Sequence, residues 1–218
     1  MSKKKLIIIG TSLYSDIAEH YFNNYTNYEI IGFAESIDVF NKKKKNDKNI
    51  YILEELDKFF NPNEVFIFNS IGYKKHNKIR ELRYNQLKKK KFKFASYISD
   101  KATILNNQIG ENCFILENNV IQPFVIIGNN TFLWSGNHIG HHSKIGENVF
   151  ISSHVVVSGN CEIGNNTFLG VNSTISDSIK IGSYCVIGAN TLIDKSLKDN
   201  SVVKKKADEI KIINRDII

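Results

Sequence analysis

Aliphatic residues recur at every sixth position through the second half of the chain. All fifteen positions from 109 to 193, counted in steps of six, carry Ile, Leu or Val. Ile-Gly pairs recur every 18 residues, at 109–110, 127–128, 145–146, 163–164 and 181–182. A six-residue unit is one short strand and a turn, and three units close one triangular coil. The pattern therefore predicts a parallel β-helix over about residues 97–200, with these repeat positions facing inward at roughly the 4.8 Å spacing of strands.

Small side chains occupy a second inward position, two residues before the repeat position. They are Cys113, Thr131, Ser143, Cys161, Thr167, Ser173, Cys185 and Thr191. All three cysteines of the chain lie there, where a buried thiol fills space as a small hydrophobic group. We therefore expect structural cysteines rather than a catalytic thiol. We also expect the glycine that follows many repeat positions to allow a tight bend at the corner.

The first hundred residues alternate between strand and helix patterns. The expected strands are Lys4–Ile9, Tyr28–Ala34, Ile50–Leu53, Val65–Ile71 and Phe92–Ile98, and the expected helices are Tyr14–Asn24, Glu54–Phe60 and Lys75–Lys90. This order predicts a small Rossmann-like βαβ domain over residues 1–96, ahead of the β-helix at 97–200 and a tail at 201–218. The turn after the first strand begins a helix, and free N–H groups at a helix start suit phosphate. Its sequence holds one glycine, so the dinucleotide fingerprint is incomplete.

The formal net charge of +7 belongs to the first hundred residues, which contain 19 basic and 12 acidic side chains. The lysine runs Lys42–Lys45 and Lys88–Lys91 are expected in a loop and at a helix end. They lack the interleaved aromatic residues of a nucleic-acid module, and we expect no nucleic-acid partner. No apolar run reaches the roughly 18–20 residues of a membrane span, and the start lacks a secretory core. We expect a cytoplasmic protein.

Four of the six histidines lie within seventeen residues, at His138, His141, His142 and His154. Acyl transfer from a thioester needs a base that removes a proton from the attacking group. Imidazole suits that role because its pKa lies near neutral pH. The cluster therefore marks the prism as a candidate catalytic unit.

A small Rossmann-like domain followed by hexapeptide repeats resembles the NeuD/PglD-type sugar acyltransferases. The resemblance implies a left-handed β-helix and a homotrimer whose active sites lie between subunits. It implies acetyl-CoA as co-substrate, no metal, and the amino group of a nucleotide-linked deoxyamino sugar as acceptor, in surface-glycan synthesis. It places the general base at His141. An acidic residue follows the base in several relatives, whereas this chain has His142, so the tautomer of His141 needs another partner.

The same resemblance assigns further residues. His154 is expected to line the same cleft as His141, with Asn172 one coil beyond it. The expected nucleotide-sugar positions are Gly10, Thr11, Ser12, Glu35, Ser36 and Gly72, with Arg80 beyond them. Ser152, Gly170 and Gly188 stack at 18-residue spacing and are expected beside the pantetheine arm of the acyl-CoA, although tight-turn roles explain them equally well.

Four other functions stay open from the sequence. One is sugar O-acetylation of the sialic acid O-acetyltransferase type, which differs only in a hydroxyl acceptor. A second is a zinc enzyme of the γ-carbonic-anhydrase type, because three neutral imidazoles can hold zinc. A third is nucleic-acid binding, suggested by charge alone. The fourth is a noncatalytic scaffold, against which the histidine cluster argues.

Overall fold

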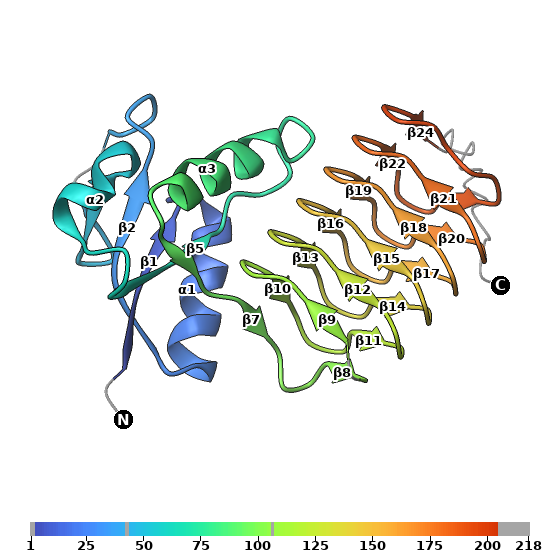
Figure 1. The fold of residues 1–218 in the computed structure, drawn as a ribbon, viewed down its shortest axis with the longest axis horizontal. Helices are drawn as coiled ribbons and strands as arrows, with labels where there is room; N and C mark the ends of the chain where they lie inside the picture. Colours follow the sequence, from blue (N-terminus) through green and yellow to red (C-terminus); the bar gives the residue numbers. More distant parts are fainter. Residues whose placement is uncertain (1–2, 42–43, 106, 205–218) are drawn as a thin grey trace, which may run out of the picture.

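A six-stranded sheet forms the core of the N-terminal domain in this computed structural model, which describes residues 3–41, 44–105 and 107–204 (Figure 1). The strand order is β3-β4-β2-β1-β5-β6. The bounds are β1 Lys4–Ile9, β2 Tyr28–Glu35, β3 Lys44–Lys45, β4 Lys48–Ile52, β5 Val65–Asn69 and β6 Lys93–Phe94. All pairs are parallel except the β3–β4 hairpin. Parallel neighbours need crossover connections, which the helices provide.

Helices cover both faces of this sheet. They are α1 (Leu13–Tyr25), the 3-10 turn η1 (Leu53–Glu55), α2 (Leu56–Phe59) and α3 (Lys78–Lys89). Phe22 of α1 packs with Leu6 and Ile8 of β1, whereas α2 and α3 pack on the side of Ile7 and Ile9. Because successive strand residues point to opposite faces, a strand covered on both sides must be apolar throughout. The Rossmann-like prediction is confirmed at this level.

Two details of the N-terminal domain differ from the prediction. The segment Phe92–Ile98 is not one strand: β6 ends the N-terminal sheet, and β7 (Tyr97–Ile98) begins the prism. Part of the lysine run expected as a loop forms β3, which pairs antiparallel with β4. The preceding Lys42 and Lys43 lie outside the described residues.

The rest of the chain winds into a triangular prism with three parallel faces (Figure 1). Face 1 holds β7, β10 (Phe114–Ile115), β13 (Phe132–Leu133), β16 (Phe150–Ile151), β19 (Phe168–Leu169), β22 (Val186–Ile187) and β24 (Val202–Val203). Face 2 holds β8 (Thr103–Ile104), β11 (Val120–Ile121), β14 (His138–Ile139), β17 (Val156–Val157), β20 (Thr174–Ile175) and β23 (Leu192–Ile193). Face 3 holds β9 (Gln108–Ile109), β12 (Ile126–Ile127), β15 (Lys144–Ile145), β18 (Glu162–Ile163) and β21 (Lys180–Ile181). Face 1 thus continues to residue 203, into the segment expected as a tail, of which residues 205–218 lie outside the described part.

The interior of the prism follows the six-residue repeat. The repeat positions from 115 to 193 are buried and form one cluster, and Ile109 packs against it while partly exposed. Cys113, Cys161 and Cys185 are free and buried, as expected. Burial raises the pKa of the Cys113 thiol to about 12, so this thiol stays protonated and unreactive at neutral pH.

The glycine that follows the repeat position has a different role from the expected one. The left-handed bend lies two residues later, at φ near +60°, and is mostly taken by asparagine, as at Asn130 and Asn148. A Cβ on Gly164 would lie 2.5 Å from the backbone of Gly182 and Ser183 in the next coil. Glycine at this position therefore lets successive coils stack closely.

Face 1 carries a column of aromatic side chains that docks the N-terminal domain. Phe114, Phe132, Phe150 and Phe168 follow one another at 18-residue spacing and join the α1 side of the sheet in one cluster. The rings of Phe132 and Phe68 of β5 are stacked, with centroids 5.9 Å apart. The two domains thus share one hydrophobic core across face 1.

Arg80 of α3 is buried completely between the two domains, next to Gly72. Its guanidinium donates to the backbone oxygens of Gly72, Asn130 and Asn148, among others, at 2.8–3.2 Å. It also lies over the ring of Phe132, 4.5 Å from the centroid. Burial lowers the pKa of Arg80 to about 9, which leaves it charged at neutral pH. Arg80 therefore fastens α3 to the prism.

Glu117 makes a second polar link between the domains. It accepts hydrogen bonds from Tyr21 of α1 at 2.8 Å and from Ser135 of the next coil at 2.6 Å. Burial raises the pKa of Glu117, but hydrogen bonds from Ser135, its own backbone and Tyr21 lower it more, so the pKa lies below its ordinary value. The ionised carboxylate is therefore favoured in the folded protein.

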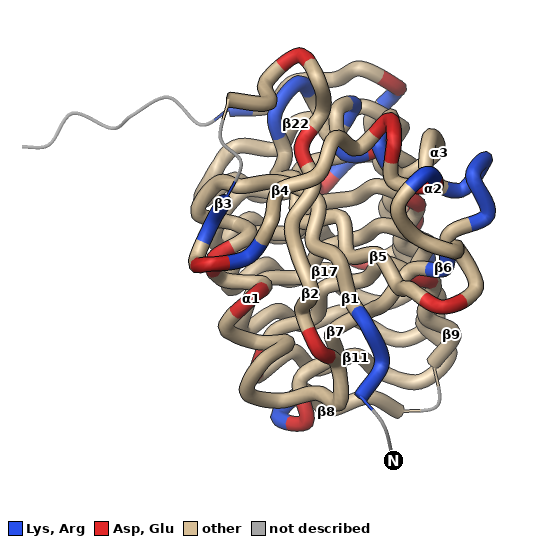
Figure 2. The backbone as a smooth tube through the Cα atoms, turned by 90° about the vertical axis from the view of Figure 1, so that its left-hand side faces the viewer, with Lys and Arg blue, Asp and Glu red and all other residues tan. Residues whose placement is uncertain are grey.

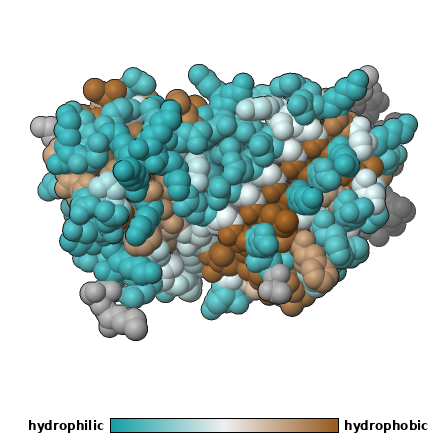
Figure 3. Space-filling view, in the orientation of Figure 1, coloured by the Kyte–Doolittle hydropathy of each residue, from teal (hydrophilic) through white to brown (hydrophobic). Residues whose placement is uncertain are grey.

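Charge and hydropathy divide the surface between the domains. Figure 2 shows Lys and Arg at the start of β1, in β3 and around β6, with acidic segments between them. In Figure 3 hydrophobic atoms form a band across the prism, whereas the N-terminal domain is largely hydrophilic in that view. Within the described ranges, no helix is both long and apolar enough to cross a membrane.

Candidate functional site

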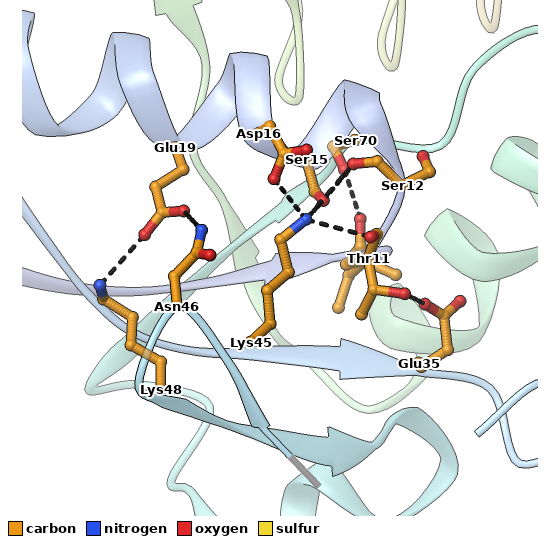
Figure 4. Close-up of polar contacts among 11 residues, drawn as sticks. Thr11, Ser12, Ser15, Asp16, Glu19, Glu35, Lys45, Asn46, Lys48 and Ser70 are labelled. Atoms are coloured by element: carbon orange, nitrogen blue, oxygen red, sulfur yellow. Dashed lines mark hydrogen bonds and ion pairs between the residues drawn. The ribbon is translucent and has the colours of Figure 1, made fainter. Parts of the chain in front are cut away.

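The loop after β1 joins the expected phosphate position to the end of β2. Gly10 has φ +100° and donates its N–H to the backbone oxygen of Ala34 at 2.8 Å. The Thr11 hydroxyl donates to Glu35 at 2.6 Å (Figure 4). Ser12 is exposed and occupies the N-cap position of α1, but its side chain makes no capping hydrogen bond. The carboxyl ends of β1 and β2 thus bring Gly10, Thr11, Ser12 and Glu35 together, with an acidic group facing the turn.

Ser36 and Gly72 lie close to this loop, but both are buried. The Ser36 hydroxyl donates to Glu54 at 3.0 Å and accepts from Arg83 at 2.6 Å. A Cβ on Gly72 would lie 2.7 Å from the ring of Tyr14, so glycine is needed there for packing. The contacts observed at both residues hold the loops in place.

Lys45 is a site residue that sequence reasoning missed. It reaches from β3 to the first turn of α1, where its ammonium lies 2.6 Å from Asp16 and from the Ser15 hydroxyl and 3.0 Å from the Thr11 backbone oxygen (Figure 4). The lysine run appeared to be a solvated loop, and only the β3–β4 hairpin directs this lysine inward. Lys45 thus ties the β3–β4 hairpin to the start of α1 through an ion pair with Asp16.

His141 and His142 lie at the corner between faces 2 and 3, called the 2–3 corner, and both are exposed. Their Nδ1 atoms are 3.1 Å apart, close enough to share one proton. The backbone N–H of His141 donates to the side-chain Oε1 of Gln122 at 2.9 Å. The ring of His142 packs on the ring of Phe124, with centroids 4.7 Å apart. His142 has φ +59°, so it takes the left-handed bend of its coil. The pair is thus fixed at Nδ1, which leaves the Nε2 edge of His141 available for chemistry.

Within one chain His154 does not share that corner. It follows β16 of face 1 and lies at the 1–2 corner, exposed, with its ring over Gly136. Asn172 is above it at the same corner, as expected. His154 lies twelve residues after His142. Because each side of a coil takes six residues, this distance covers two of its three sides and ends at a different corner. His138 points outward from face 2, between the two corners.

The residues expected beside the acyl-CoA lie at the 1–2 corner, together with His154. Ser152 is buried, and a Cβ on Gly170 would lie 2.6 Å from the backbone of Ala189 in the next coil. A Cβ on Gly188 would meet nothing closer than 3.3 Å. Gly170 therefore serves close coil stacking, whereas Gly188 is less crowded, with the backbone of Val203 and Lys204 as its nearest neighbours.

The arrangement of imidazoles bears on the zinc alternative. Within one chain His141 and His142 lie at one corner, and His154 lies at another. Across the residues that the structure describes, no group of three or more His, Cys, Asp or Glu is placed to hold a metal ion. The ligand set of a zinc enzyme is therefore not assembled by a single prism.

Comparisons with known proteins identify the repeats. The family model of the bacterial transferase hexapeptide (six repeats) matches residues 108–141, 124–159 and 160–195. No curated protein sequence matches the chain.

Three solved structures share the fold over nearly the whole chain. The acetyltransferase domain of PglB from Neisseria gonorrhoeae is 19% identical with a TM-score of 0.81, covering 92% of this chain and 96% of that one. A variant of perosamine N-acetyltransferase from Caulobacter crescentus, in complex with CoA and GDP-perosamine, is 17% identical with a TM-score of 0.80, covering 94% and 97%. WeeI from Acinetobacter baumannii is 18% identical with a TM-score of 0.77, covering 90% and 94%.

Residues 108–195 thus carry the hexapeptide repeats found in bacterial transferases, and they form a triangular parallel prism. The chain as a whole has the two-domain fold of the PglB acetyltransferase domain and of perosamine N-acetyltransferase, a small α/β domain on a left-handed β-helix. The predicted fold class and resemblance are confirmed.

Proposed function

We propose that the protein transfers an acyl group, with acetyl as the first candidate, from a coenzyme A thioester to the amino group of a nucleotide-linked deoxyamino sugar. Perosamine N-acetyltransferase, a structural neighbour, is described with CoA and GDP-perosamine. The observation that carries the proposal is the exposed His141, whose Nδ1 is held by His142 on a hexapeptide-repeat prism. Surface-glycan synthesis in the cytoplasm is the setting that this chemistry suits.

In the proposed reaction the amine nitrogen of the sugar attacks the thioester carbonyl carbon. A C–N bond forms, the C–S bond breaks, and the thiolate of coenzyme A leaves. His141 takes the proton that the amine loses, and the thiolate takes a proton in turn. Because a hydroxyl is a weaker nucleophile than a neutral amine, the O-acetyl alternative would depend more heavily on the same base.

The nucleotide is proposed to lie at the carboxyl ends of β1 and β2. Gly10, Thr11, Ser12 and Glu35 meet there, and the free N–H groups at the α1 N-terminus suit a phosphate. The acyl-CoA is proposed to lie along the 1–2 corner, where Ser152, Gly170 and Gly188 follow one another at 18-residue spacing and leave this column with small side chains only.

The test measures coenzyme A release from acetyl-CoA with a panel of nucleotide-linked amino sugars and hydroxyl-matched sugars. We expect turnover with an amino sugar, and a loss of at least about 100-fold in kcat for His141→Asn. His76→Asn is the matched control, since His76 is an exposed histidine outside the prism. Full activity of His141→Asn would refute the base assignment, and selective turnover of hydroxyl sugars would favour O-acetylation.

We also propose a homotrimer whose sites form between prisms. The outward face 2 exposes Val120, Val156 and Leu192, and the corners with His141 and His154 are its two edges. If one prism supplies His141 and its neighbour supplies His154, mixing the inactive variants His141→Asn and His154→Asn restores intact sites. Random mixing in a trimer then returns about a quarter of wild-type activity. No recovery in mixed trimers would contradict the shared site.

A further inference from the structure

Phe124 is an exposed aromatic residue at a place where the chain bends sharply. It lies at the 2–3 corner between β11 and β12, is 64% exposed and has φ +65°. This left-handed conformation is costly for a bulky side chain, and the same bend in the following coils is taken by His142, Asn160 and Ser178. The Phe124 ring packs on the ring of His142, with centroids 4.7 Å apart, so its position is fixed. A strained and exposed phenylalanine at this corner points to a role beyond local folding.

A small aromatic pocket lies at the other edge of face 2, the 1–2 corner. Its walls include Tyr21 and Tyr25 of α1, Tyr97 of the first coil and Glu117 of the second, and its volume is about 150 Å³. A cavity of that volume is large enough to hold one benzene ring. The pocket therefore has the size and the chemistry to receive a single aromatic side chain.

The walls of the pocket are held in place without an occupant. The ring of Tyr21 lies 4.8 Å from that of Tyr97 and 6.0 Å from that of Tyr25, between centroids. The Tyr21 hydroxyl donates to Glu117 at 2.8 Å, which fixes the ring that the other two contact. The exposed side chains of Asp100 and Lys101 complete the lining. Aromatic walls with a charged rim are the composition found at the centre of protein–protein interfaces.

Phe124 and the pocket lie on opposite edges of face 2 and at the same height along the prism. Glu117 and Phe124 belong to one coil, at its successive 1–2 and 2–3 corners, with the partly exposed Val120 of face 2 between them. Rotation about an axis parallel to the prism keeps equal coils at equal height. The 2–3 corner of one copy then meets the 1–2 corner of the next at the level of the pocket. Head-to-tail contact between two different edges closes into a ring, and the smallest such ring has three copies.

We propose that Phe124 of each subunit inserts into the pocket of Tyr21, Tyr25 and Tyr97 on the neighbouring subunit and anchors the trimer. The inference rests on the homotrimer of the proposed function and names the residues that hold it together. A ring already fixed by His142 that enters a preformed pocket loses little conformational freedom on binding. Its burial removes an exposed aromatic surface from each of the two copies.

Cysteine cross-linking tests the contact directly. In the double variant Phe124→Cys/Tyr25→Cys, a short bismaleimide joins neighbouring subunits, and denaturing gels show covalent dimers and trimers, whereas each single variant stays monomeric. The three native cysteines are buried and do not interfere. Phe124→Cys/Lys101→Cys is a second test pair that keeps all three tyrosines. In the matched control Phe124→Cys/Phe59→Cys, the second position is as exposed as Tyr25 but lies on α2, across the N-terminal sheet from α1. Absence of cross-links from both test pairs, or equal yields in the control, would overturn the proposal.

Analytical ultracentrifugation over a concentration series measures the contribution of the ring. Phe124→Asn removes it and places at the bend the residue type found at Asn160, so the coil itself is preserved. The concentration at which half of the trimer dissociates rises about 30-fold or more, as for a central aromatic anchor, whereas Phe59→Ala leaves it unchanged. A trimer as stable in Phe124→Asn as in the wild type would refute the anchor. Neither measurement involves turnover, so a cross-linked trimer that acylates none of the tested sugars refutes only the proposed reaction.

Discussion

Removing the Arg80 side chain should destabilise the whole protein while leaving substrate binding unaffected. In Arg80→Met the backbone oxygens of Gly72, Asn130 and Asn148 lose their donor. A buried acceptor without a partner costs about 1–3 kcal/mol. Three such groups, partly rehydrated by water entering the gap, give a loss of about 3–5 kcal/mol, the range seen when a buried charged partner is removed. For a chain of this length the loss corresponds to a Tm lower by about 6–20 °C.

The assay is thermal unfolding followed by circular dichroism at fixed protein concentration, with limited proteolysis to detect separation of the domains. Lys88→Met is the matched control, because Lys88 also joins α3 to the prism, through Glu111 at 2.6 Å, but is exposed. An exposed ion pair contributes about 0–1 kcal/mol, so its Tm stays within a few degrees of wild type. A normal Tm for Arg80→Met combined with a raised KM for the nucleotide sugar would refute the structural role and return Arg80 to the binding site.

Three further outcomes follow from burial and packing. The pKa of Glu117 is lower in the folded protein than its ordinary value of about 4.3. The ionised carboxylate of Glu117 therefore stabilises the fold above that ordinary value, and this contribution is lost as the pH falls through the pKa of Glu117 in the folded protein. The Tm difference between wild type and Glu117→Gln is therefore largest near pH 7 and shrinks as the pH falls below the ordinary pKa of glutamate; a constant difference would contradict the shift. Gly164→Ala lowers stability by about 1–3 kcal/mol in denaturant unfolding, whereas Gly188→Ala costs less because its Cβ would approach no atom closer than 3.3 Å; equal losses would refute the coil-stacking role. The Cys113 thiol resists a thiol reagent in the native protein and reacts after unfolding; rapid native reaction would show that it is accessible.

The prism was predictable because its interior repeats. Each aliphatic residue at a repeat position fills the same place in successive coils, so a single period fixes strand positions and burial together. The role of glycine was misassigned because the glycine that follows the repeat position lies only two residues before the left-handed bend of the corner. Asparagine three residues after the repeat position, as at Asn130 and Asn148, was the visible signal for the left-handed bend.

Contacts between the domains were beyond sequence reasoning for a physical reason. The pattern of apolar residues in Lys75–Lys90 predicts a helix, but it does not say what covers each side of that helix. Arg80 is buried because the prism supplies backbone oxygens from two coils, at Asn130 and Asn148. The inward turn of Lys45 likewise depends on the β3–β4 hairpin, which the lysine run did not suggest.

The candidate site shows that the six-residue register carries more than secondary structure. Multiples of 18 keep a residue at one corner, whereas shifts of 6 or 12 move it to a different corner. By this rule His154, twelve residues after His142, lies at another corner of the same prism. The sequence therefore contained this information, which was missed because closeness in sequence was taken for closeness in space.

The same rule applied to outward residues explains the three faces. Face 1 presents phenylalanines, and the N-terminal domain covers them. Face 3 presents Lys144, Glu162 and Lys180, with an ion pair of 3.2 Å between the last two, as expected of a surface in water. Face 2 presents valine, threonine, leucine and histidine, partly exposed, with nothing from the described chain packed over it. An apolar face bordered by two histidine corners is the arrangement expected of a surface that a second copy covers, with a proposed catalytic group at each edge.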